Sequence, residues 1–144
     1  MFLYGFYDIN KENTKFATER CKLLKGSGYK MKVIKYDNAL KGKNSDKCKT
    51  LEYSFMDKDI DLGIATISGR YPDDGYGVNL VSKELIYVIE GSGTLNFEDK
   101  KIDFSKGDSI LIEPNEKYYY DTEYCVISMT CTPAWSVEQH KLVK

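Results

Sequence analysis

The sequence is poor in the residues that most often build a metal or redox centre. Histidine occurs once in 144 residues, as His140, and no two cysteines are spaced as C-x-x-C. A lone imidazole cannot supply the several nitrogen ligands that hold iron, manganese or zinc, and the missing C-x-x-C excludes the usual zinc ribbons and dithiol redox sites. We therefore expect no metal and no cofactor. Because His140 follows Glu138 and Gln139, we expect it to be exposed or to contact the tail, and not to act as a catalytic base.

The chain also lacks an excess of charge of one sign and any long apolar run. It has 21 Lys and Arg against 22 Asp and Glu, a formal net charge of -1. No overall field attracts nucleic acid or anionic lipid, no run approaches the roughly 18 apolar residues of a membrane span, and residues 1–7 lack the positive start of a signal peptide. We expect a cytoplasmic protein without a nucleic-acid or membrane partner. The lysine-rich residues 41–49 have no interleaved aromatics and are interpreted as a solvated loop, part of a loop over 38–48.

The length fits one domain with its own hydrophobic core. A helix is predicted over residues 11–25, because Asn10 can cap it, Ala17, Cys21 and Leu24 recur at helical spacing, and Gly26 supplies a stop. We divide the chain into an N-terminal extension, residues 1–30, and a single barrel domain, residues 31–144.

From residue 50 onward the sequence favours short strands. β-branched and aromatic runs alternate with turn residues, which is typical of a barrel or sandwich. Turns are predicted at residues 91–93, 98–100 and 114–115. The predicted strands cover residues 31–36, 51–55, 60–71, 77–81, 85–90, 93–97, 101–104, 108–112, 117–120 and 125–132.

Two stretches resemble the paired motifs of the cupin superfamily. They are GYGVNLVSKELIYVIEG at residues 75–91 and GDSILIEPNEKY at residues 107–118. Glu84 stands seven residues before Gly91, as in the first motif, and a short apolar strand and a proline turn follow Gly107 as in the second. The resemblance covers roughly residues 60–132. It implies a small single-domain cupin of the cupin 2 type, an all-β double-stranded β-helix (jelly-roll) barrel, here with a short N-terminal helical extension.

The resemblance fails at the metal ligands. Cupins that hold a metal generally have two histidines before the motif glutamate and one in the second motif. Those positions are Gly77, Asn79 and Tyr118 here, and only Glu84 is retained. We therefore predict a metal-independent barrel.

Strand parity places Glu84 on the same face as Ile86 and Val88, opposite Leu85 and Tyr87. A carboxyl group facing an apolar interior has to be paired, hydrogen-bonded or protonated, and its pKa should rise unless a cation reaches it. One interpretation makes Glu84 a ligand contact or general base. The other makes it an ancestral metal ligand that Tyr118 and Asn79 now satisfy.

Further candidate residues surround this carboxyl group. Tyr118 and Tyr120 share one face of their strand, with Tyr119 opposite, and Tyr118 is our choice for the cavity. Tyr118 either donates a proton or hydrogen bond or simply fills the barrel as an aromatic ring. Asn79 suits recognition of a hydroxyl or carbonyl group. The candidate rim residues are Arg70, Tyr71, Tyr76 and Trp135, whose aromatic faces suit a sugar ring or a dimer contact.

Three functions are compatible with this sequence. The first is binding of a small molecule, a sugar or a polar organic acid, by Asn79, Glu84, Tyr118, Tyr120 and the rim residues. The second is a metal-independent isomerase, epimerase or lyase that acts on a carbonyl-containing sugar, with Glu84 and Tyr118 as catalytic acid and base. The third is an oligomeric role, for which we expect a homodimer, with residues 1–7 as one possible clasp.

Overall fold

The computed structural model describes residues 22–23 and 31–144, and these form an all-β sheet protein. The predicted class is confirmed. Its elements are β1 Lys22–Leu23, β2 Lys32–Val33, the 3₁₀ turn η1 Tyr36–Asn38, β3 Leu40–Ser45, β4 Cys48–Tyr53, β5 Asp61–Tyr71, β6 Tyr76–Asn79, β7 Lys83–Phe97, β8 Lys101–Ser105, β9 Ser109–Ile112, β10 Lys117–Thr132 and β11 His140–Val143.

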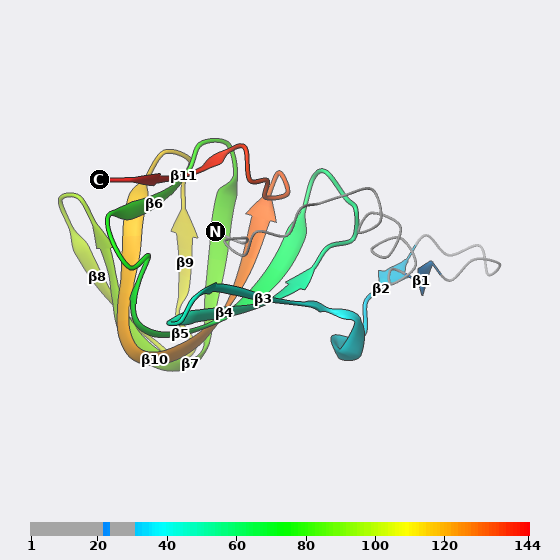
Figure 1. The fold of residues 1–144 in the computed structure, drawn as a ribbon, viewed down its shortest axis with the longest axis horizontal. Helices are drawn as coiled ribbons and strands as arrows, with labels where there is room; N and C mark the ends of the chain where they lie inside the picture. The colour runs from blue at the N-terminus through cyan, green and yellow to red at the C-terminus, as the bar shows by residue number, and fades with distance from the viewer. Residues whose placement is uncertain (1–21, 24–30) are drawn as a thin grey trace.

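One antiparallel sheet of nine strands makes up the body of the protein. Its order is β11-β6-β10-β5-β4-β3, and β7 pairs with β10, β8 and β9. Figure 1 shows β7 and β10 curving together around the closed end of the sheet, so that the remaining strands form the walls of a half-barrel. Because β10 pairs with β5, β6 and β7, it joins the two walls.

The two longest strands, β7 and β10, differ from the prediction. The turn predicted at residues 91–93 and the break predicted between residues 120 and 125 are both absent from them. β7 runs through Gly91 and Gly93 without a hairpin, and β10 is continuous from Lys117 to Thr132. Register shifts between Asp121 and Tyr124 mark a bulge that lets both strands bend. Gly91 has a φ of 82°, and a side chain there would collide with the carbonyl oxygen of Tyr124. The glycine therefore serves a bend inside a strand and not a turn between strands.

The predicted loop over residues 38–48 is also wrong. Most of it forms β3, which pairs with β4 in a hairpin. Lysine, glycine and asparagine have low strand propensity, but pairing with a neighbouring strand overrides a local preference of this size. β3 lies at the edge of the sheet, where exposed lysines discourage pairing with another chain.

The predicted helix over residues 11–25 lies almost wholly outside the described residues. Only Lys22 and Leu23 of that range are described, and they form strand β1 paired with β2. The end of the predicted helix is therefore corrected: strand pairing overrides the local helical pattern there. The predicted strand over residues 31–36 is reduced to Lys32–Val33.

The barrel interior is filled by alternate residues of the strands. On β7, Glu84, Ile86 and Val88 are buried, while Leu85 and Tyr87 are exposed on the outer face, as the parity predicted. On β10, Tyr118 and Tyr120 are buried in the same core. Among the described residues, the buried polar and charged side chains are Thr50, Asn79, Ser82, Glu84, Thr122, Gln139 and His140.

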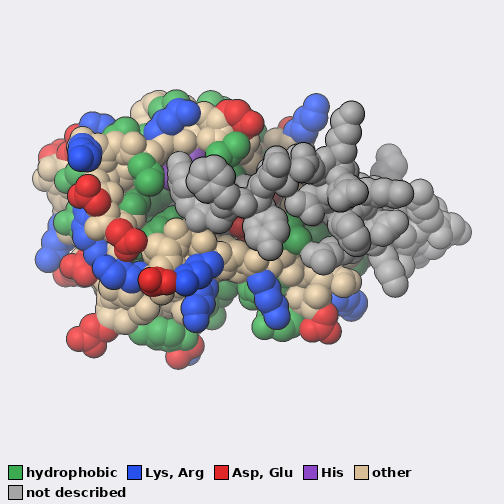
Figure 2. All heavy atoms as spheres, viewed as in Figure 1, with side chains coloured by type: hydrophobic (Ala, Val, Ile, Leu, Met, Phe, Trp, Pro, Cys, Tyr) green, Lys and Arg blue, Asp and Glu red, His purple; other side chains and the backbone are tan. Residues whose placement is uncertain are grey.

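The outer surface mixes charges of both signs. On the face shown in Figure 2, lysine and arginine side chains are interspersed with aspartate and glutamate. Among residues 22–23 and 31–144, no helix has the length and apolar character needed to cross a membrane.

Two neighbouring residues on β7 test this packing. Ile86 is 0% exposed and Leu85 is 49% exposed. Ile86→Ala removes buried methyl groups and leaves a cavity, so we expect a loss of about 2–5 kcal/mol in the free energy of unfolding. Leu85→Ala is the matched control and should change it by no more than about 0.5–1 kcal/mol. Urea unfolding followed by circular dichroism measures both, and equal losses would contradict the assigned faces of β7.

Candidate functional site

Among the residues that the structure describes, one carboxyl group is buried inside the barrel. Glu84, near the start of β7, is 0% exposed and shares its face with Ile86 and Val88. Leaving such a group without partners would cost several kcal/mol. The residues around it therefore have to satisfy it.

Three hydrogen-bond donors converge on this carboxyl group. The Asn79 Nδ2 amide donates to Oε2 over 3.1 Å, and the Tyr118 hydroxyl lies 3.3 Å from both oxygens. The Cys131 thiol donates to Oε2 over 3.8 Å. β6 supplies the amide, and β10 supplies the phenol and the thiol. β10 pairs with β6 at Tyr118 and with β7 at Cys131, which stands directly opposite Glu84.

Burial determines the protonation of this group. Desolvation raises the pKa of Glu84 above its ordinary value, and the hydrogen bonds from Asn79, Tyr118 and Cys131 oppose that rise. Burial, followed by the nearby Glu84 carboxyl, raises the pKa of Tyr118 well above its ordinary range. A carboxyl group and a phenol in contact, both favouring their protonated forms, can exchange a proton with a bound molecule.

The position of His140 corrects the expectation that it is exposed. The imidazole is 4% exposed, and its Nδ1 lies 2.9 Å from the Asn79 Oδ1 atom. His140 begins β11, which pairs with β6 so that His140 stands directly opposite Asn79. Directly opposite residues in an antiparallel pair share a face, which explains why the side chain points inward.

The residue before His140 holds this strand in place. The Gln139 Oε1 atom accepts hydrogen bonds from the backbone N–H groups of Val81 (3.0 Å) and Ser82 (3.1 Å). Its Nε2 donates to the Ser82 hydroxyl over 2.9 Å, and that hydroxyl donates to the Pro133 carbonyl over 2.7 Å. This network ties the C-terminal segment to the loop between β6 and β7.

Tyr120 adds a second phenol to the interior. Its ring packs edge-on against Tyr118 and Phe104, with centroid separations of 5.8 Å and 6.3 Å. The hydroxyl is buried and has no hydrogen-bond partner among the described residues. A buried hydroxyl without a partner costs about 1–3 kcal/mol, so this oxygen favours a bound water or ligand atom.

The candidate rim residues do not all reach this site. The Arg70 guanidinium stacks on the Tyr119 ring at 3.9 Å and donates to the carbonyls of Pro72 (2.6 Å) and Gly75 (2.7 Å). Tyr76 packs edge-on against the same Tyr119 ring at 5.5 Å. Because Tyr119 points opposite to Tyr118 and Tyr120, Arg70 and Tyr76 form a separate cluster on the outer face.

Trp135 and Tyr71 do lie beside the site. The Trp135 ring is 5.7 Å from the His140 ring and packs against the core. The Trp135 backbone N–H donates to Asp61 Oδ2 over 2.8 Å, which anchors the chain after β10. Tyr71 is buried at the end of β5 and belongs to the same core cluster as Tyr118.

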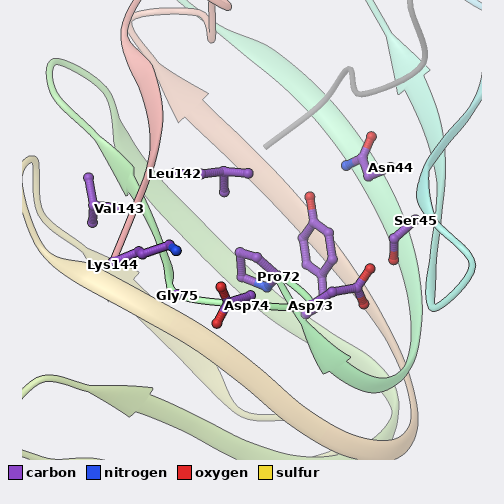
Figure 3. Close-up of a pocket in the computed structure, with 10 residues that line it drawn as sticks. Asn44, Ser45, Pro72, Asp73, Asp74, Gly75, Leu142, Val143 and Lys144 are labelled. Atoms are coloured by element: carbon purple, nitrogen blue, oxygen red, sulfur yellow. The ribbon is translucent and has the colours of Figure 1, made fainter.

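Tyr71 also borders a cavity of about 330 Å³. It is lined by Asn44, Ser45, Tyr71, Pro72, Asp73, Asp74, Gly75, Leu142, Val143 and Lys144 (Figure 3). The cavity therefore lies between β3, the loop before β6 and the end of β11. Its volume falls within the range of small-molecule sites.

The interior does not fit a metal ion of the kind that many barrels of this type hold. Gly77, Asn79 and Tyr118 occupy the positions where the predicted family has histidines, and the Asn79 amide and the Tyr118 hydroxyl direct hydrogen atoms at Glu84. The partial positive charge of those hydrogen atoms would repel a cation bound to Glu84. Within the described part of the chain, no three His, Cys, Asp or Glu side chains group as metal ligands.

Comparison with known proteins agrees with the sequence motifs. Residues 81–127 match the family described as Cupin domain. No curated protein matches the chain. Solved structures resemble its fold at low identity, which supports the fold and not a shared activity.

Two of these structures are informative. Pac13 from Streptomyces, solved with uridine and described elsewhere as a unique nucleoside dehydratase, has a TM-score of 0.68 at 16% identity, covering 76% of this chain and 88% of that one. The polyketide cyclase RemF from Streptomyces resistomycificus has a TM-score of 0.62 at 15% identity, covering 79% of this chain and 86% of that one.

The raised pKa of Glu84 has a measurable effect on stability. A group whose pKa is higher in the folded state contributes stability that is present below its unfolded pKa, about 4.5, and lost as pH rises through the folded value. Relative to Glu84→Gln, the wild-type protein should lose about 1.4 kcal/mol for each unit by which that pKa is raised. The hydrogen bonds that change when Glu84 is replaced by glutamine shift the free energy of unfolding by an amount that does not depend on pH.

The measurement is the free energy of urea unfolding at several pH values between about 4 and 8. The exposed residue on the same strand, Glu90, provides the control substitution Glu90→Gln. Parallel curves for wild type and Glu84→Gln would show that Glu84 has no raised pKa.

Proposed function

We propose that the barrel of this chain, whose residues 81–127 match the family described as Cupin domain, binds a polar small molecule without a metal ion, either a sugar or a polar organic acid. One observation supports the proposal above others. Glu84, Asn79, Tyr118, Tyr120 and His140 are all buried, and hydrogen bonds and ring contacts link them into one cluster. A core needed only for stability has no use for so many polar groups, since each has to be compensated. In a binding site they orient a ligand.

The unused hydrogen-bonding capacity of the cluster supports the same proposal. The Tyr120 hydroxyl has no partner in the described part of the chain. A ligand hydroxyl or carbonyl would satisfy it and recover the free energy that its isolation costs. The fold neighbour Pac13 was solved with uridine, a molecule that combines a sugar with a polar ring, so uridine is a suitable first probe.

The test is calorimetric titration of the full chain with uridine, galactose and galacturonate. We expect at least one of them to bind, and Tyr118→Phe to weaken that binding by about five- to ten-fold, because one hydrogen-bonding hydroxyl is lost from the site. Tyr119→Phe is the matched control, since Tyr119 faces outward, and it should bind as the wild type does. If none of the three compounds binds, the proposal is contradicted.

A second candidate function is a metal-independent isomerase, epimerase or lyase. The contact between Glu84 and Tyr118, 3.3 Å to each carboxyl oxygen, favours it, because an acid and a base within hydrogen-bond reach can move a proton on a carbonyl-containing sugar. In this alternative Glu84 and Tyr118 are the catalytic pair.

Incubation with the same compounds in D₂O separates the two functions. An enzyme of this class would exchange a carbon-bound proton for deuterium, and NMR would detect the loss of that signal. Tyr118→Phe should slow the exchange by about 100-fold or more, whereas Tyr119→Phe should leave it unchanged. Binding without exchange would support the small-molecule-binding function and contradict the enzymatic one.

A further inference from the structure

The outer face of the sheet carries exposed apolar side chains next to one another. Leu85 is 49% exposed, Tyr87 is 48% exposed and Leu111 is 53% exposed. Leu85 stands directly opposite Leu111 in the pairing of β7 with β9, and directly opposite residues lie on the same face of a sheet. Single apolar residues on a surface are ordinary, but a large contiguous group of them marks a contact surface.

Strand pairing continues this group across five neighbouring strands. Two rows of directly opposite residues run from β9 through β7, β10 and β5 to β4. The first row is Leu111, Leu85, Thr130, Leu62 and Tyr53, and the second is Ser109, Tyr87, Ser128, Ile64 and Leu51. None of these ten side chains is buried by the part of the chain that the structure describes. We call these two rows the outer apolar face.

The outer apolar face contains no charged residue. Seven of its ten residues are aliphatic or aromatic, and the other three are serine or threonine. Because 30% of the residues of this chain are charged, ten solvent-facing positions should include about three charges. Depletion of charge is typical of the centre of a protein–protein interface. The composition of the face therefore favours contact with another apolar protein surface.

Charged residues return in the next row of the sheet, with opposite signs at its two ends. This row is Glu90 on β7, Val126 on β10, Thr66 on β5 and Lys49 on β4. Three strand spacings of about 4.8 Å place Glu90 and Lys49 roughly 14 Å apart. A two-fold axis parallel to the strands, between β10 and β5, sets Glu90 of one copy against Lys49 of the partner subunit at both ends of the row. The charges thus complement those of a second copy.

We propose that two copies of this chain associate through the outer apolar face, sheet against sheet, about a two-fold axis parallel to the strands. Aligned sheets pack face to face in this way in β-sandwiches. The face and the charged row beside it cover roughly 500 Å², so the dimer buries about 1,000 Å², which is near the lower limit for a specific interface. We expect a weak dimer, with a dissociation constant of about 1–100 µM. The inference does not depend on the proposed function.

Analytical ultracentrifugation of the full chain over about 1–200 µM tests the association. We expect a monomer–dimer equilibrium that shifts with concentration. Tyr87→Lys places an ammonium group in the centre of the apolar face, where it is desolvated without a partner, and should raise the dissociation constant by about 30-fold or more. Tyr36→Lys is the matched control. Tyr36 is 62% exposed on η1, outside the three rows, and its variant should associate as the wild type does.

An exchange of charges tests the two-fold arrangement. Glu90→Lys sets like charges against each other at both ends of the charged row and should raise the dissociation constant by about ten-fold. Lys49→Glu should have the same effect. The double variant Glu90→Lys with Lys49→Glu restores opposite charges, so its dissociation constant should return to within about three-fold of the wild-type value.

Three results would overturn the inference. A wild-type chain that stays monomeric at every concentration would show that a second copy is not what occupies the face. A dimer that persists in Tyr87→Lys would place the contact on another surface. A double variant that associates as weakly as Glu90→Lys alone would contradict the two-fold arrangement.

Association also sets the conditions for the stability measurements. Below the dissociation constant of the dimer, unfolding reports on the monomer alone. The comparisons with Leu85→Ala and Glu90→Gln therefore belong at such concentrations, where neither substitution acts through the contact between copies.

Discussion

A carboxyl group that is fully enclosed by an apolar barrel has to find its hydrogen bonds inside that barrel, and this requirement organises the site. Glu84 receives donors from Asn79, Tyr118 and Cys131, which come from β6 and β10. Asn79 is then committed through its nitrogen, which leaves its oxygen for His140. One buried carboxyl group therefore sets the orientation of an amide, whose oxygen then faces the imidazole.

The imidazole in this barrel comes from a different strand than the histidines of the predicted family. The positions that hold histidine in the predicted family are Gly77, Asn79 and Tyr118 here. His140 reaches the same region from β11, opposite Asn79 and next to Gly77. It does so as a neutral group hydrogen-bonded to an amide. A methyl group at residue 77 would lie 3.4 Å from the ring, which is ordinary van der Waals contact.

The sequence predicted the parts of this arrangement that depend on local pattern. Alternation along β7 placed Glu84 inward and Leu85 outward, and the same parity paired Tyr118 with Tyr120. The two cupin motifs identified the fold, which the family match and the fold neighbours support. The contacts of Glu84 with Asn79 and Tyr118 agree with one of the two interpretations of the sequence, in which these residues satisfy the carboxyl group.

The parts that were missed depend on contacts distant in the sequence. His140 is 61 residues from Asn79, and no local pattern indicates that β11 pairs with β6. The only signal was the short run from 140 to 143, whose alternation is too brief to identify a strand. The glycines of β7 were interpreted as a turn because a turn and a bent strand require the same backbone freedom. β3 was missed because strand pairing outweighed its composition.

The order of the strands along the chain has a consequence for the making of the protein. β11 follows all the other strands of the sheet, yet it supplies the imidazole, and Gln139 just before it closes the loop between β6 and β7. During synthesis the barrel wall can assemble while Asn79 still lacks this neighbour. The inner polar cluster is therefore finished only when β11 docks against β6 and brings His140 to Asn79.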